Sequence, residues 1–170
     1  MEAGEALVEK AVTRVARESS DFQTIRLGDL KLSAGVGARR IYHAEIRGDP
    51  ATVTVAMYQG GGAKEEWRQH VAKYKLIRHP NVMQLYGLVS TKELHAMVFH
   101  DELIPYHQFF GRFKYSPILS AYIIGYCTTE FNEAGRYISD VFQKTVSSND
   151  LDAWIRPSTG KLCLDLVQGA

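Results

Sequence analysis

The sequence predicts an α+β fold, and three observations lead to that class. Short runs of alternating apolar and polar residues follow one another between about residues 28 and 104, which indicates β-strands. Longer stretches elsewhere carry apolar residues at spacings of three and four, which is typical of amphipathic helices. The chain has 170 residues, of which 45% are apolar and 23% charged, and this fits one globular domain or one domain with an appendage.

The first predicted elements are an N-terminal helix and a strand meander. Residues 1–20 form an amphipathic helix in this prediction, because apolar side chains recur at helical spacing between residues 5 and 18. From about residue 29 the period changes to two, and we predict three strands, at 29–32, 39–47 and 51–58. The turn signal Gly48-Asp49-Pro50 separates the last two strands, which favours antiparallel pairing.

One helix and two more strands complete the segment 28–104. A helix is predicted over 63–78, because Trp67, Val71 and Tyr74 recur at spacings of three and four among helix-forming residues and Pro80 ends the pattern. Two strands follow, at 83–90 and 94–99. The segment 28–104 is therefore predicted to be a five-stranded antiparallel sheet with one helix, which packs Val71 and Tyr74 against the sheet.

The segment 105–170 is predicted to be mainly helical with a terminal hairpin. A short helical turn is expected at 106–110, and a helix begins at Ser116-Pro117, where serine can cap the free amides. This helix runs to about Phe142, either unbroken or interrupted near Thr128-Thr129. After a loop at 147–150, two short strands, 154–155 and 161–166, form the hairpin.

This order of elements resembles the protein-kinase fold, and several sequence phrases carry the resemblance. Residues 76–89, Leu-Ile-Arg-His-Pro-Asn-Val-Met-Gln-Leu-Tyr-Gly-Leu-Val, are similar to the phrase that kinases carry between the small-lobe helix and the fourth strand. Val55-Ala56-Met57-Tyr58 lies where the third strand of a kinase has its V-A-[IV]-K motif. The resemblance implies a kinase-like small lobe at 28–104 and a partial, mainly helical stub of the large lobe at 105–170.

The resemblance also implies that the small-lobe catalytic residues are replaced. Tyr58 stands at the position of the phosphate-binding lysine, and His70 stands at the position of the helix glutamate that pairs with it. We expect these two side chains to face each other and form at most a phenol–imidazole hydrogen bond. In the glycine-rich loop, Gly35 and Gly37 match the first two glycines, but Arg40 stands in place of the third.

The large-lobe motifs are degenerate in the same comparison. Counting from the Ser158-Thr159-Gly160 turn puts Ala153 at the metal-binding asparagine, Ser148 near the catalytic aspartate, and Leu166 at the first residue of the D-F-G segment. Asp150 and Asp165 are nearby carboxylates that a gap of one or two residues would bring into these positions. Because the sequence ends at Ala170, we expect no activation segment and no further large-lobe helices.

The function expected from these replacements is binding without catalysis. The chain would be a scaffold, decoy or regulator that acts through protein–protein contacts, with no cofactor and no tight ATP binding. The alternative is an unusual nucleotide-binding protein or phosphotransferase that uses the interlobe cleft. Its candidate cleft residues are Gly35, Gly37, Ala56, Phe99 and Asp101. A third interpretation is an unrelated small α+β domain.

The charge and composition restrict the classes of partner that this chain is expected to bind. A net charge of +1 does not favour nucleic acid, and the six histidines lack the spacing of a metal site. The most apolar stretch, Ile118 to Cys127, is too short for a membrane helix, and the first 20 residues lack a signal-peptide core, so we expect a soluble, cytoplasmic chain. This stretch is apolar on nearly every face and needs a cover from residues 5–18, a second copy or another protein.

Cys127 and Cys163 are expected as free thiols, with one disulfide as the other option.

Overall fold

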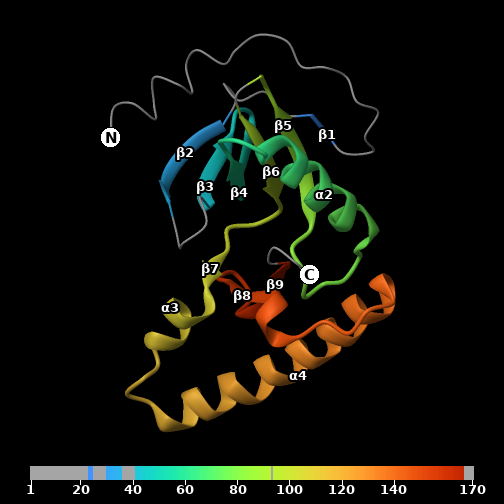
Figure 1. Ribbon diagram of the computed structural model, residues 1–170. Coiled ribbons are helices and arrows are strands. Elements are labelled where there is room, and N and C mark those ends of the chain that lie inside the picture. The colour runs from blue at the N-terminus through green and yellow to red at the C-terminus, as the bar shows by residue number, and fades with distance from the viewer. Residues whose placement is uncertain (1–22, 25–29, 36–40, 93, 167–170) are drawn as a thin grey trace. The chain divides into compact units, whose positions relative to one another are not determined.

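The computed structural model describes residues 23–24, 30–35, 41–92 and 94–166, with the side chains of 23–24 and 30–35 excepted. The N-terminal helix predicted for residues 1–20 lies outside these residues. The chain divides into two compact units. The first, here called the sheet unit, contains the chain up to Lys75 and Leu85–Asp101, and the second, here called the hairpin unit, contains Leu76–Gln84 and the chain from Glu102 onwards. The fold class is α+β, as predicted (Figure 1).

The sheet unit is built on a six-stranded sheet with the order β1-β5-β6-β4-β3-β2. The five predicted strands are present and pair antiparallel. The prediction of a purely five-stranded antiparallel sheet is wrong in one respect, because β1 adds a sixth strand that pairs parallel with β5. Two residues are too few to show an alternating pattern, so the sequence could not reveal this strand. The strands are β1 (Gln23–Thr24), β2 (Leu30–Gly35), β3 (Ile41–Ile46), β4 (Asp49–Tyr58), β5 (Leu85–Ser90) and β6 (His95–Phe99).

The two faces of β4 carry different side chains, as its alternation predicted. Val53 and Val55 belong to a buried apolar cluster, and Met57 packs against it. The other members of this cluster come from β3, β5, β6 and the residue before β6: Ala44, Val89, Leu94, Ala96 and Val98. The residues between them in β4, Ala56 and Tyr58, therefore lie on the opposite face of the sheet.

Helix α2 (Ala63–Leu76) covers the face that carries Ala56 and Tyr58 (Figure 1). Gly60 and Gly62 have φ values of 102° and 80°, which let the chain turn from β4 into the helix. The ring of Tyr74 contacts that of Phe99 at 5.0 Å, and Trp67 Nε1 donates a hydrogen bond to the Ala96 carbonyl at 3.0 Å. The buried side chains of α2 are Ala63, Trp67, His70, Val71 and Tyr74. The prediction that the helix packs Val71 and Tyr74 against the sheet is therefore confirmed.

The hairpin unit combines a three-stranded sheet with two helices. Strands β7 (Ile104–Pro105), β8 (Leu151–Arg156) and β9 (Lys161–Leu166) pair antiparallel in that order. Helix α3 (Tyr106–Gly111) is short, and a 3₁₀ turn, η2 (Ser148–Asp150), precedes β8. Helix α4 (Pro117–Phe142) is unbroken at Thr128-Thr129, and the Thr129 hydroxyl donates back to the Gly125 carbonyl. Ser116 precedes α4, but its side chain makes no capping hydrogen bond, so the predicted cap is wrong.

The outer edge of β9 is closed by polar contacts. The Leu162 N–H donates to the Glu130 carboxylate at 2.8 Å, and the Asn81 side-chain amide donates to the Leu162 carbonyl at 2.9 Å. The Leu164 N–H donates to the Asn81 carbonyl, and the Met83 N–H donates to the Leu164 carbonyl. The segment between the helix and β5 therefore pairs with β9, which explains why β5 begins at Leu85 and not at residue 83 as predicted.

Two further sequence predictions concern cysteines and membranes. Cys127 and Cys163 are both free and buried, as expected. Within the described part of the chain, no helix has the length and apolar character needed to cross a bilayer.

Candidate functional site

The centre of the candidate site is the pair formed by Tyr58 and His70. Tyr58 is the last residue of β4, and His70 lies in the middle of α2. The Tyr58 hydroxyl and His70 Nδ1 are 2.6 Å apart, and the two rings meet edge to face at a centroid distance of 5.6 Å. Both residues are buried, with 7% and 3% of their surface exposed. The sequence predicted that these side chains face each other, and their geometry agrees.

This pair links the helix to the sheet through a hydrogen bond and contains neither a lysine nor a glutamate. A phenol is uncharged at neutral pH and can donate its proton to the unprotonated nitrogen of an imidazole. A short hydrogen bond of this kind holds α2 on β4, but the phenol offers no ammonium ion to a phosphate group. A lysine or a glutamate alone at either place would be a buried charge without its counter-ion, which is strongly destabilising.

The residues expected to line a nucleotide cleft have mixed environments. Ala56 is buried in β4 opposite Met97. Phe99 is fully buried, and its ring contacts that of Tyr74. Asp101 is exposed and has a φ of 70°, and its carbonyl accepts a hydrogen bond from the Thr54 hydroxyl at 2.9 Å. Gly35 ends β2 opposite Tyr42. Gly37 lies outside the described residues.

Ser148, Ala153 and Leu166, which were predicted to stand at the large-lobe motif positions, all lie in the hairpin unit. None of them lies opposite another. Ser148 is exposed at the start of η2. Ala153 of β8 lies opposite Leu164, and Leu166 ends β9 opposite Leu151. Leu166 is only 1% exposed, so it serves as part of the apolar core of this unit.

The hairpin instead brings two carboxylate residues into register, which the sequence analysis missed. Asp152 of β8 lies directly opposite Asp165 of β9. Asp165 is buried and Asp152 is exposed. Counting outward in equal steps from the 157–160 turn would have found this pair, because residues of a hairpin oppose each other at equal distances from its turn.

Asp150, the other carboxylate considered from the sequence, has a local role. Its Oδ2 accepts hydrogen bonds from the N–H and the hydroxyl of Ser147, both at 2.8 Å. These hydrogen bonds lower the pKa of Asp150. Asp150 therefore caps the turn before β8. Among the described residues, no group of three or more His, Cys, Asp or Glu side chains is arranged to hold a metal ion.

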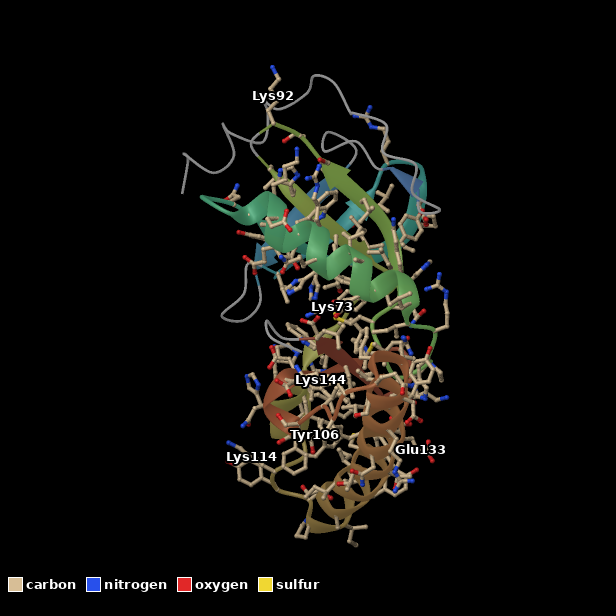
Figure 2. All side chains as sticks on the ribbon, turned by 45° about the vertical axis from the view of Figure 1, so that its right-hand side comes forward. Lys73, Lys92, Tyr106, Lys114, Glu133 and Lys144 are labelled. Atoms are coloured by element: carbon tan, nitrogen blue, oxygen red, sulfur yellow. The ribbon has the colours of Figure 1, made fainter. Side chains whose placement is uncertain are left out.

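A second candidate surface lies on α4. One stripe of this helix is buried, through Ile123, Cys127, Ala134 and Ile138. Other large apolar side chains are exposed, with 83% of Ile118 and 68% of Tyr122 accessible. We call the exposed group the α4 patch; its members are Tyr115, Ile118, Leu119, Tyr122 and Ile124. The Lys114 ammonium lies 4.8 Å from the centre of the Tyr115 ring at the border of this patch (Figure 2).

Neither a protein-family model nor a curated protein matches this sequence.

Proposed function

We propose that this chain is a catalytically inactive, kinase-like binding or regulatory module that acts through protein–protein contacts. The observation that carries the proposal is the buried hydrogen bond between Tyr58 and His70. In the kinase resemblance, these two positions hold the ion pair that binds and orients the nucleotide phosphates. The pair in this chain preserves the link between helix and sheet and lacks the lysine ammonium that binds the phosphates in a kinase.

The α4 patch supports the binding half of the proposal. Its side chains contribute apolar surface on the order of several hundred Å², which is about the largest patch that monomeric proteins usually expose. Ile118, Leu119 and Tyr122 lie within one helical turn or so of each other and offer a ridge that another apolar surface can cover. A protein partner or a second copy of the chain would supply that cover.

The first test concerns nucleotide chemistry. We expect millimolar ATP to produce no magnesium-dependent rise in melting temperature and no phosphate transfer. The variant Tyr58→Lys should stay inactive and melt at a lower temperature, since the new ammonium is buried beside His70 and has no glutamate to pair with. Thermal melting with ATP and magnesium, each alone and together, and a radiolabel transfer assay measure both outcomes. Turnover by the parent chain or by Tyr58→Lys would contradict the proposal.

The second test concerns association. We expect light scattering at high concentration to give about twice the chain mass of 19.1 kDa if a second copy covers the α4 patch. The double variant Ile118→Asp, Tyr122→Asp should then scatter as a monomer with an unchanged fold by circular dichroism, because both side chains are exposed. Glu133→Gln, at an exposed position further along α4, is the matched control. A monomeric parent chain at every concentration would exclude self-association and leave another protein as the occupant.

A second candidate function is nucleotide binding that uses metal held at the hairpin. The observation that favours it is the register of Asp152 with Asp165, since paired carboxylates are the usual ligands of magnesium. This candidate predicts a magnesium-dependent ATP shift that Asp152→Asn weakens. The inactive module predicts no such shift in either protein, so one melting series separates the two.

A further inference from the structure

Helix α4 carries an uncharged, exposed strip on the side opposite its buried residues. The helix contacts β9, and Ile123 and Cys127 are each only 5% exposed (Figure 1). With 3.6 residues per turn, Ile118 and Tyr122 project from the other side of the helix, where both are exposed. The sequence contains no charged residue over 115–129, so this exposed strip is about 22 Å long and offers no ionic group to water.

The two ends of this strip carry opposite charges. Lys114 precedes it and Glu130 follows it, each eight positions from Tyr122. Glu130 is half-exposed, while its carboxylate accepts the Leu162 N–H. In an antiparallel pair of helices centred on Tyr122, the Lys114 of each copy lies level with the Glu130 of the other. A parallel pair would bring like charges together at both ends, which is unfavourable.

Gly125 is an independent indication that another chain comes close to this strip. Glycine inside a helix is less favourable than alanine, yet Gly125 has no positive φ that would require it. Apart from the backbone of its own helix, a methyl group at this position would meet no atom of the described chain within 4 Å. Ala121, one turn earlier, is also small and exposed. Two small residues in succession allow a second helix to approach closely, and the arrangement centred on Tyr122 brings Leu119, which is 46% exposed, level with Gly125.

We propose that two copies of this chain associate as an antiparallel, two-fold symmetric dimer through the α4 residues 115–129. This inference rests on the binding function proposed above and identifies the partner as a second copy. The two apolar surfaces would together bury on the order of 1,000 Å², which is near the lower limit for a specific interface. We therefore expect a reversible dimer with a dissociation constant in the micromolar range.

Engineered cysteines in the full chain test the arrangement. Only a residue near the centre of an antiparallel pair meets its own copy, so Tyr122→Cys should form an intermolecular disulfide when diamide is added. Ile118→Cys and Thr129→Cys should not, because each lies away from the centre, whereas a parallel pair would cross-link all three. The parent chain is the control, since its Cys127 and Cys163 are buried. Non-reducing gel electrophoresis gives the result, and a Tyr122→Cys variant that does not cross-link overturns the proposal.

A glycine variant separates association from stability. Gly125→Gln should melt at the same or a slightly higher temperature, because glutamine favours a helix, and it should dimerise at least about tenfold more weakly, because the new side chain keeps the two helices apart. Gly135→Gln is the matched control, since Gly135 lies on α4 beyond 115–129 and its added Cβ also meets nothing within 4 Å. This control should dimerise as the parent chain does. Sedimentation equilibrium measures the association of all three proteins.

The outcomes distinguish this inference from the proposed function. Equal association of Gly125→Gln and the parent chain, or a parent chain that stays monomeric at every concentration, overturns the dimer. The binding function would then belong to a surface that another protein covers. Phosphate transfer from ATP would contradict the inactive module, but it would not change the association measured by sedimentation.

Discussion

Replacement of Val71 by aspartate is expected to unfold the sheet unit. Val71 is 6% exposed on the buried face of α2, between His70 and the Tyr74 ring that contacts Phe99. An aspartate there would be a buried charge without a partner, which costs about 3–5 kcal/mol in comparable cases. A domain of this size gains or loses roughly 4–8 °C in melting temperature per kcal/mol, so the drop should exceed about 10 °C.

The measurement is thermal unfolding followed by circular dichroism, with Leu76→Asp as the matched control. Leu76 ends the same helix and is 61% exposed, so the same substitution there keeps the charge in water. We expect this control to lose less than about 1 kcal/mol, from an acidic residue at the negative end of the helix. If Val71→Asp melts within a few degrees of the parent chain, α2 does not pack on the sheet through this face.

Replacement of Asn81 by leucine is expected to destabilise the hairpin unit, because a buried carbonyl loses its hydrogen-bond donor. The side chains have nearly the same shape, but leucine cannot donate to the Leu162 carbonyl, which the Asn81 amide contacts at 2.9 Å. Leu162 is 2% exposed, so its carbonyl would be left buried and unpaired. Such a loss costs about 1–3 kcal/mol.

Chemical denaturation, followed by the fluorescence of Trp154 in β8, reports on this unit. The second tryptophan, Trp67, lies in the sheet unit, and a Trp67→Phe background removes its signal from both proteins. Asn132→Leu is the control, because Asn132 is exposed on α4. A midpoint for Asn81→Leu equal to that of the control would mean that the Asn81 contact does not stabilise the hairpin.

Much of the fold could be predicted because the decisive patterns are local. The alternation in β4 and the spacing of Trp67, Val71 and Tyr74 in α2 report directly on which side chains are buried. The Tyr58–His70 pair could also be predicted, since the alternation of a strand and the periodicity of a helix each identified one inward-facing position. The kinase-like assignment of these residues stays a prediction.

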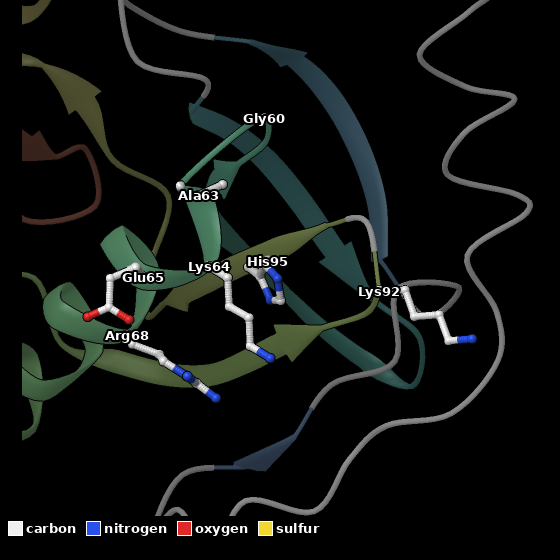
Figure 3. A pocket seen from close by; sticks show the side chains of 8 residues that line it. Gly60, Ala63, Lys64, Glu65, Arg68, Lys92 and His95 are labelled. Atoms are coloured by element: carbon white, nitrogen blue, oxygen red, sulfur yellow. The ribbon is translucent and has the colours of Figure 1, made fainter.

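The features that escaped prediction depend on contacts between distant segments. The pairing of β1 with β5 joins residues more than 60 positions apart and involves too few residues to leave a pattern. A cavity beside α2 is lined by residues of that helix and of the β5–β6 region, so no single segment shows it (Figure 3). Asp152 and Asp165 could have been paired by counting, but the placement of Ala153 and Leu166 was one residue away from that register.

The closed edge of β9 has a consequence for how other chains can approach the hairpin unit. An exposed strand edge invites templated growth, in which an extended peptide or another copy adds itself as the next strand. Here Glu130 and the 81–83 segment occupy the hydrogen-bonding positions of Leu162 and Leu164, and β7 at the other side is two residues long and includes Pro105, which has no N–H to donate. Recognition by strand addition is therefore blocked at β9, and the two-residue β7 offers only a short edge. A partner that approaches β9 therefore has to contact side chains, and loss of the Asn81 contact would expose the Leu162 carbonyl at a strand edge.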